Sequence, residues 1–311
     1  MERPLIPQRE VKGPNTGDYE FYWYIAAWVD LLGQSEKLDQ LDELPTTEAQ
    51  KREFVQRAQR TFGAVRSFRD RMAELHAILA RPLSLPAGML VTLNKDDLRL
   101  FKKYSSPEVK ISFLSDSALL TVCLRENAGW SPLLSVDFML SQLAIIALTM
   151  VAQGTPIRGG MAAGICSVLR EGDLYGKAVS RANQLEKAAG YPRIVVDDSL
   201  LEYVAWCEHQ PATGREQQLR AHHVQAIKSA FRADADGQKI LSYLGERFKR
   251  EYGHETHFPE IVALASTFVA GEIERFRRSG NEKLLERYQK LKAYFEQEDC
   301  WKPSASSSMD K

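Results

Sequence analysis

The most restrictive feature of this sequence is an uncharged, mainly apolar run from Met139 to Ala152. A helix that crosses a membrane needs about 20 apolar residues, so a run of this length predicts a helix buried in a protein core. Ser131 and Pro132 precede the run and are typical of an N-cap and the first helical turn. We therefore expect a core helix that begins at this pair, and no membrane partner.

Strand and helix patterns alternate around this core helix. The period of apolar residues behind Thr47 predicts a long amphipathic helix that opens with a capping box, and Gly176 opens another helix that runs to Ala189. The order of the elements predicts an α+β fold in which helices pack on one side of a sheet. Strand-like runs lie at 19–32, 109–115, 117–125, 157–170 and 191–197.

Beyond residue 200 the sequence predicts helices and no strands. The apolar periods of these helices lie near 216–232, 237–250, 259–278 and 282–298. The chain therefore divides into a flexible N-terminal arm at 1–18, an α+β domain at 19–200, a helical C-terminal region at 201–299 and a disordered tail at 300–311.

Composition narrows the functional classes. Lys and Arg number 41, and so do Asp and Glu, which excludes a domain whose main task is to coat nucleic acid. The four cysteines are dispersed without a CxxC pair, which is typical of reduced thiols in the cytosol. The sequence opens without the apolar run of a signal peptide, so we expect a cytoplasmic protein. The DADG segment at 234–237 lacks the essential carboxylates of a calcium loop.

Two aspartates and one helix face are the strongest candidates for chemistry. Asp30 ends an otherwise uncharged strand, and Asp116 stands at the bend between two strands. If these strands are neighbours, the carboxylates converge and can bind divalent cations together with a backbone carbonyl and phosphates. The alternative is two unrelated turn aspartates. The helix at 176–189 has a polar face, for which the alternative is a solvated surface. This face carries Lys177, Ser180, Arg181 and Gln184.

Four segments of the chain, in order, resemble the motifs of class III nucleotide cyclases. Trp28–Gly33 resembles the strand-end segment FxDIxGF, and Ser115–Asp116 resembles the hairpin turn that carries the second metal aspartate. Arg158–Gly164 resembles the strand RxGxxxG, and Asp173–Leu185 resembles in part D-x-aromatic-G and its helix. The resemblance covers about residues 19 to 200 and implies the cyclase fold, an antiparallel or mixed sheet with packed helices.

Further details resemble one branch, the Pycsar pyrimidine cyclases of bacterial antiviral defence. These details are the turn SDS at 115–117, the RGG strand and the segment A-x-x-L-E at 182–186. The resemblance implies a homodimer with two composite active sites, each with two Mn²⁺ ions or, as the alternative, Mg²⁺. It also implies conversion of UTP to 3′,5′-cyclic UMP and pyrophosphate, and a separate effector protein that binds the product.

The resemblance assigns metal and phosphate roles to particular residues. The metals would be held by Asp30, Asp116 and the backbone carbonyl of Leu31. Backbone amides from Gly33 to Ser35 would cradle phosphates, as oriented N–H groups do, and Arg170 would clamp the triphosphate.

The residues assigned to the base and the transition state depart from the family pattern. Asp173 is retained, but Ser112 stands where the purine cyclases have a base-reading lysine. Ser180 and Gln184 stand at the positions of the transition-state asparagine and arginine, and we expect Arg181, on the same helix face, to substitute.

Uracil is the predicted base, and three alternatives stay open. Loss of the lysine opposes a purine, and the bulky Tyr24 and Trp28 precede Asp30 on its strand, where one of them could narrow the pocket. The preference for uracil over cytosine rests mainly on the resemblance. The alternatives are a cytidylate cyclase, an adenylate or guanylate cyclase, and a catalytically inactive cyclase-like dimer that binds nucleotide.

Overall fold

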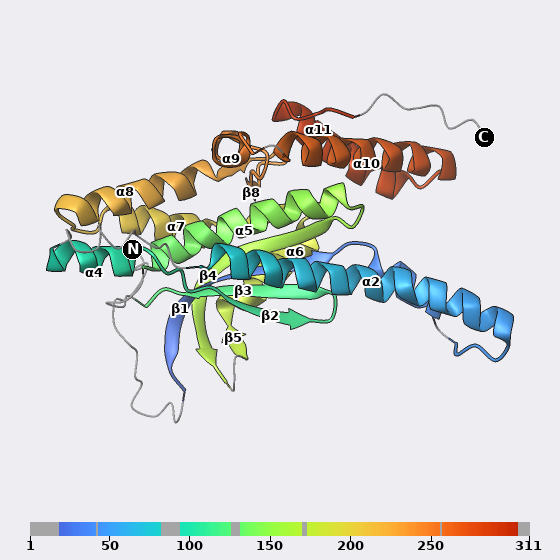
Figure 1. Cartoon of the computed structure of the whole chain (residues 1–311), viewed down its shortest axis with the longest axis horizontal. Helices are drawn as coiled ribbons and strands as arrows, with labels where there is room; N and C mark the ends of the chain where they lie inside the picture. The colour runs from blue at the N-terminus through green and yellow to red at the C-terminus, as the bar shows by residue number, and fades with distance from the viewer. Residues whose placement is uncertain are drawn as a thin grey trace.

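The computed structural model describes residues 19–41, 43–81, 94–125, 131–169, 173–255 and 257–303, and it has the predicted α+β fold (Figure 1). The sheet has the strand order β2-β3-β1-β4-β6-β8-β7, and β5 pairs with β4 outside this path. β1 is antiparallel to β3 and β4, whereas β4 and β6 are parallel, so the sheet is mixed. The strands are β1 (Phe21–Leu31), β2 (Lys110–Leu114), β3 (Ser117–Cys123), β4 (Ile157–Val168), β5 (Leu174–Gly176), β6 (Ile194–Val196), β7 (Phe231–Ala233) and β8 (Lys239–Leu241).

The helices pack around this sheet, and their caps follow from the sequence. The capping box predicted at Thr47 is present, because its side chain accepts from the backbone N–H of Gln50 while the Gln50 side chain bonds back. The helices are α1 (Gln34–Leu38), the 3₁₀ helix η1 (Asp39–Leu41), α2 (Glu48–Leu79), α4 (Lys95–Lys103), α5 (Pro132–Ala152), α6 (Lys177–Ala188), α7 (Asp198–Glu208), α8 (Gly214–Ser229), α9 (Glu246–Tyr252), α10 (Phe258–Ser279) and α11 (Glu282–Gln297).

The central strand β1 is buried on both faces. Successive side chains of a strand point to opposite faces. Ile25 and Val29 join the core formed with α5, whereas Tyr24 joins a second core with Ala182 of α6. The prediction that helices pack on one side is therefore wrong, because α6 covers the face opposite α5. A Cβ at Gly160 of β4 would lie 2.2 Å from the carbonyl oxygen of Ala182, so this glycine permits the close approach of α6.

The core helix α5 runs from Pro132 to Ala152 and begins at the predicted pair. Within the described ranges it is the one helix long and apolar enough to cross a membrane, with a mean hydropathy of 1.9. About two thirds of its apolar window, 67%, is buried inside the fold. That burial identifies it as the core helix expected from the sequence.

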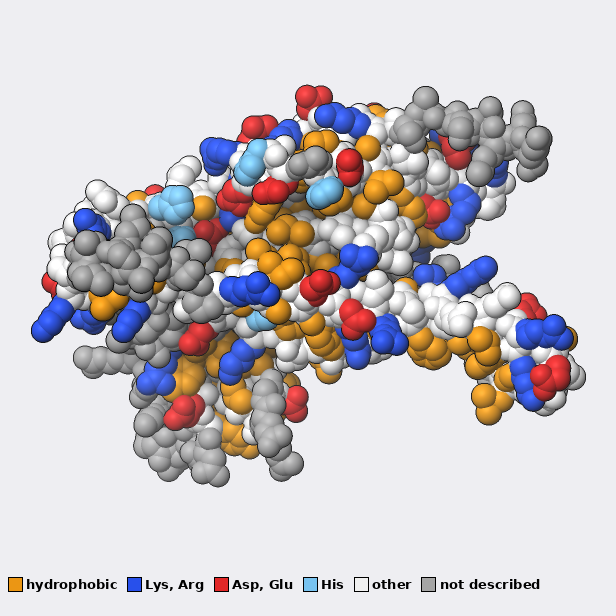
Figure 2. Space-filling view, viewed as in Figure 1, with side chains coloured by type: hydrophobic (Ala, Val, Ile, Leu, Met, Phe, Trp, Pro, Cys, Tyr) orange, Lys and Arg blue, Asp and Glu red, His pale blue; other side chains and the backbone are white. Residues whose placement is uncertain are grey.

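The N-terminal half of α2 projects beyond the sheet (Figure 1). Val55 and Phe62 on this half are 51% and 59% exposed. Figure 2 shows apolar side chains along the projecting end, and it shows open space between this end and the C-terminal helices. A single chain therefore leaves apolar surface of α2 uncovered.

The C-terminal region also contributes strands, so the prediction that strands end before residue 200 is wrong. β7 and β8 form a hairpin, and Ile240 of β8 pairs with Val195 of β6. Each strand has three residues, too few to show a period in the sequence. The boundary at residue 200 stays a prediction, although the sheet continues past it.

The first residues of the predicted C-terminal tail are ordered. Cys300 is buried and Trp301 packs against the core, so ordered packing extends past residue 299. The rest of the predicted tail, residues 304–311, and the predicted arm, residues 1–18, lie outside the described residues.

Candidate functional site

The structure brings Asp30 and Asp116 together at one edge of the sheet. Asp30 is the register partner of Ser117 on β3, which directly follows Asp116. The Ser117 hydroxyl donates to Oδ1 of Asp30 at 2.7 Å, and the backbone N–H of Leu31 donates to the carbonyl oxygen of Asp116 at 3.3 Å. These two contacts fix the end of β1 against the hairpin turn.

The hairpin turn is held from the α2 side as well. Leu114 pairs with Ser117, so the turn consists of Ser115 and Asp116 alone. Ser115 adopts a left-handed φ of 52°, as short hairpin turns require. The guanidinium of Arg69 donates to the carbonyl oxygen of Ser115 and lies 5.6 Å from the ring centroid of Phe113. The position of Asp116 is therefore set by strand register and by α2 together.

The two carboxylates lack a full positive counter-charge within the described residues. The pKa of Asp30 is raised to about 6, mainly by burial and also by the charge of Asp116, against the hydrogen bond from Ser117 that lowers it. Arg158, the cross-strand neighbour of Asp30, is ion-paired with the buried Glu186 of α6. A hard divalent cation is the kind of charge that would compensate this arrangement.

The oxygen ligands at this edge of the sheet fit a metal site whose coordination the substrate would complete. Among the described residues no group of three or more His, Cys, Asp or Glu is placed to hold a metal ion. Two carboxylates and a backbone carbonyl would therefore leave coordination positions for water and phosphate oxygens, which is the way proteins bind Mg²⁺ with nucleotide substrates.

The loop after β1 holds a buried amide that the sequence analysis missed. Gly33 has a left-handed φ of 77°, and α1 begins directly after it. Gln34 is 1% exposed, and neither its amide oxygen nor its nitrogen has a hydrogen-bond partner within the described chain. A buried unpaired amide beside a candidate phosphate loop is a candidate contact for a ligand. Ser35 belongs to α1, and its side chain lies outside the described atoms.

Ser112 and Trp28 lie on the Asp30 face of the sheet. Ser112 pairs with Leu119, and Leu119 pairs with Trp28, so all three side chains point to one face. Trp28 precedes Asp30 by two residues and therefore shares its face. Tyr24 is on this face too, but it is buried beneath α6.

Among the described residues, the polar face of α6 makes no hydrogen bond or ion pair with Asp30 or Asp116. Ser180 and Gln184 are exposed. Arg181 lies 3.8 Å from Oδ1 of Asp197, a long ion pair at the start of α7. The structure thus leaves the predicted roles of these three residues untested.

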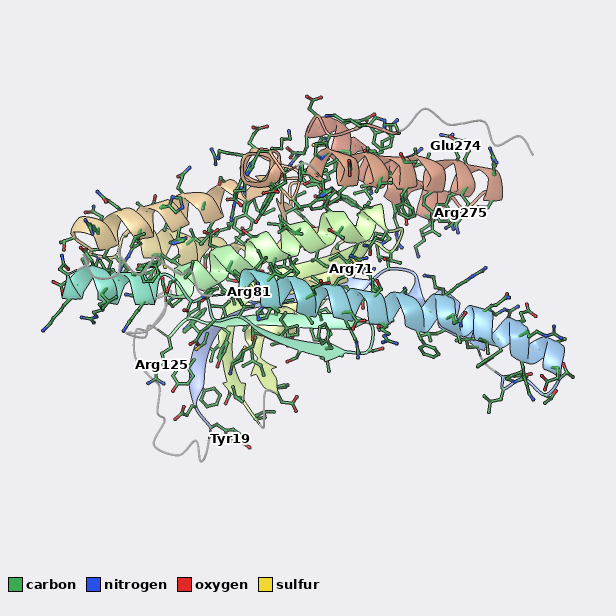
Figure 3. The ribbon with its side chains drawn as sticks, in the orientation of Figure 1. Tyr19, Arg71, Arg81, Arg125, Glu274 and Arg275 are labelled. Atoms are coloured by element: carbon green, nitrogen blue, oxygen red, sulfur yellow. The ribbon has the colours of Figure 1, made fainter. Side chains whose placement is uncertain are left out.

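Asp173 stands at the opposite end of β4 from Asp30. Arg158 pairs with Asp30, whereas Val168 pairs with Leu174, next to Asp173. Ten residues of strand separate these levels, which corresponds to roughly 30 Å. Figure 3 labels Tyr19 and Arg125, which mark this far end. One chain cannot place Asp173 and Asp30 in the same site. Arg170, the predicted triphosphate clamp, lies outside the described residues.

Comparisons with known proteins add little to this geometry. No protein-family model matches the chain, and a search of curated proteins returns no match. A search of solved structures returns a bacterial light-regulated adenylyl cyclase with 13% identity and a TM-score of 0.33. The match covers 73% of this chain and 52% of the cyclase, so this chain spans about half the length of that protein. A TM-score this low does not assign a fold, so the fold class rests on the sheet and helices described above.

Proposed function

We propose that this protein is a metal-dependent nucleotide cyclase that converts UTP to 3′,5′-cyclic UMP and pyrophosphate. The observation that carries the proposal is the pair of Asp30 and Asp116, held at one sheet edge by Ser117 and by the backbone of Leu31. Fixed acidic side chains without a matching cation are the arrangement that a metal–triphosphate complex would complete.

Asp30, Asp116 and the carbonyl of Leu31 would hold two Mn²⁺ or Mg²⁺ ions, which supply activation of the ribose hydroxyl and neutralisation of the triphosphate. In the reaction the 3′-hydroxyl gives its proton to solvent water, its oxygen bonds to the α-phosphorus, and the bond from that phosphorus to pyrophosphate breaks. The backbone amides from Gly33 to Ser35 would orient the phosphates. The unpaired amide of Gln34 is a further donor at this loop.

A homodimer is part of the proposal because one chain separates the functional ends. Asp173 lies roughly 30 Å along β4 from Asp30, by the rise of a strand. If two chains are related by a two-fold axis, the Asp30 end of each chain lies against the Asp173 end of the other, which makes two equivalent sites. Each site would then combine Asp30 and Asp116 of one chain with Asp173 and Arg181 of the partner subunit. The apolar surface that α2 leaves uncovered also favours a second chain.

The face around Asp30 favours a one-ring base, and the choice of uracil over cytosine rests mainly on the resemblance. Ser112 is too short to reach a base as a lysine would, and Trp28, on the same face, reduces the room for a two-ring base. Asp173 of the partner subunit would accept from the N3–H of uracil. The resemblance to the Pycsar branch further suggests a cytoplasmic role in antiviral defence, with the product bound by a separate effector protein.

A catalytically inactive cyclase-like dimer is the second candidate. It is favoured by Ser180 and Gln184, which cannot supply the charge of an arginine, and by the engagement of Arg181 with Asp197. In that case the chain would bind nucleotide without turnover.

Competition among the four ribonucleoside triphosphates tests both candidates. The full chain is incubated with all four at equal concentration and Mn²⁺, and the cyclic products and pyrophosphate are quantified. The matched control is the double variant Asp30→Asn/Asp116→Asn, which keeps the shape of both side chains. Predominant cyclic UMP that is lost in the control supports the proposal. Predominant cyclic CMP overturns the uracil choice, a cyclic purine nucleotide overturns the pyrimidine assignment, and nucleotide binding without product favours the inactive dimer.

A further inference from the structure

A cavity of about 260 Å³ lies at the end of the molecule opposite the projecting half of α2. It is bounded by α4, the start of α5, α7 and α8, which Figure 1 shows together at this end. Part of its wall is buried, since Tyr104, Ser131, Leu133, Tyr203 and Cys207 are each less than a tenth exposed. The cavity shares no lining residue with the Asp30 edge of the sheet.

The start of α5 supplies unused polar groups to this cavity. Ser131 is the N-cap residue and is 3% exposed, but its hydroxyl makes no cap hydrogen bond. No other side-chain hydrogen bond of this hydroxyl occurs among the residues that the structure describes. The first turn of α5 also lacks an acidic residue. The free hydroxyl of Ser131 and the uncapped end of a 21-residue helix both favour an anion in the cavity.

Arg220 of α8 lines the same cavity and brings a positive charge. It forms no ion pair or side-chain hydrogen bond with any described residue. Glu216, its acidic neighbour one turn earlier, forms an ion pair with Lys103 at 2.8 Å. This hydrogen bond is the main cause that lowers the pKa of Glu216. The guanidinium of Arg220, which has no ion-pair partner among the described residues, can therefore bind an external anion.

Aromatic rings form another part of the wall. Tyr203 and Trp206 of α7 are stacked, with ring centroids 6.2 Å apart, and Tyr104 closes the side toward α4. Pro132 and Leu133 add apolar surface. Such a wall accommodates a planar ring by stacking and burial of apolar area. The volume is below the usual range of roughly 300–1,000 Å³ for ligand pockets, so the occupant must be small.

We propose that this cavity binds a small aromatic anion, one ring system that carries a single carboxylate or phosphate group. The ring lies against Tyr203 and Trp206, and the anionic group lies between Arg220 and the start of α5. This site is independent of the proposed cyclase activity, because its residues lie on other elements.

Calorimetric titration of the full chain in EDTA tests the proposal, because EDTA removes the cations that the proposed nucleotide site needs for binding. The probes are indole-3-acetate, phenyl phosphate and uridine 5′-monophosphate, which separate carboxylate from phosphate sources. Each is matched by its neutral counterpart, indole, phenol or uridine, and acetate and inorganic phosphate serve as anions without a ring. At least one aromatic anion should bind more than about 10-fold tighter than its neutral counterpart, because a hydrogen bond to a charged group contributes that much.

Two variants and one control complete the test. Arg220→Gln should weaken binding about 10-fold or more, whereas Arg215→Gln on the same helix, whose guanidinium pairs with Asp97 outside the cavity, should leave it unchanged. Ser131→Asp should cap α5 and raise the unfolding midpoint of the free protein by about 2–4 °C. The same substitution should abolish binding by placing a carboxylate where the anion lies. Absence of binding by every aromatic anion, equal binding of neutral and anionic probes, or full affinity in both cavity variants would overturn the proposal.

Discussion

Two acidic clusters at the sheet differ in how their charge is compensated. In the C-terminal hairpin, Asp234 and Asp236 flank the buried guanidinium of Arg193. At the edge that carries the hairpin turn of β2 and β3, Asp30 and Asp116 lie together while the neighbouring guanidinium of Arg158 is paired with Glu186. Among the residues that the structure describes, the charges of the first cluster are compensated and those of the second are not.

The pKa directions follow this difference. Hydrogen bonding to Arg193 lowers the pKa of Asp236, whereas burial raises the pKa of Asp30 to about 6. The Arg193 cluster also includes the hydroxyl of Tyr191, which donates to Asp234 at 2.7 Å. The Arg193 cluster therefore attaches the C-terminal hairpin to β6, while the Asp30 cluster keeps acceptor capacity for a ligand.

The largest expected effect is on turnover. Asp116→Ala should lower cyclic nucleotide formation at least about 1,000-fold, because activation by a bound metal contributes several kcal/mol to a transition state. The unfolding midpoint of the metal-free protein should change little, since the side chain of Asp116 supports no core. Asp70→Ala, which removes an exposed carboxylate on α2, is the control and should keep full activity. Near-normal turnover of Asp116→Ala at saturating Mn²⁺ would remove the metal assignment.

The next largest expected effect is on the free energy of unfolding, when the Arg193 cluster is changed. Arg193→Ala should lower the free energy of unfolding by about 3–5 kcal/mol, because it leaves the buried carboxylate of Asp234 without its positive partner. Asp236→Asn should lower it by less than about 1 kcal/mol, since that side chain is 48% exposed. Denaturant titration of both variants measures the difference. Equal losses would mean that the cluster is not built around Asp234 as described.

The smallest expected effect is a gain in stability when Asp30 is replaced. The folded state raises the pKa of Asp30, so the contribution of this group to stability is complete below its ordinary pKa near 4 and is lost as the pH rises through about 6. In EDTA at pH 8, Asp30→Asn should therefore unfold at a higher temperature than the natural chain. The gain should fade by about pH 5, as the natural carboxyl becomes protonated.

Calorimetric scans at both pH values, with and without Mn²⁺, check this prediction. Mn²⁺ should stabilise the natural chain and leave Asp30→Asn unchanged, because a ligand stabilises only the folded state that binds it. A lower midpoint of Asp30→Asn at pH 8 in EDTA would show that the carboxylate of Asp30 is already compensated within the chain.

The sequence predicts the elements whose pattern is local. The strand that ends at Asp30 and the two strands around Asp116 show apolar runs, and the short turn forces their register. Convergence of the two aspartates was therefore predictable from the strands. Ser117 could have been found as well, because it directly follows Asp116 and must pair across from the end of β1.

Tertiary relations were the part that the sequence could not reveal. The faces of β1 are both apolar, so no pattern assigns α6 to the side opposite α5. The pairing of Arg158 with Glu186 joins residues from a strand and a helix, and neither position signals the other. The separation of Asp173 from Asp30 depends on the length and register of β4, which no motif encodes.

Subunit complementation tests the central claim, that the two ends of the sheet act together across two chains. Asp116→Ala and Asp173→Ala chains, each inactive alone, are mixed in equal amounts under conditions of proven subunit exchange, and cyclic nucleotide formation is measured with Mn²⁺. Half of the dimers would then be mixed and carry one intact site of two, so activity should recover to about a quarter of that of the natural chain. No recovery despite subunit exchange, or full activity of Asp173→Ala alone, would contradict the composite site.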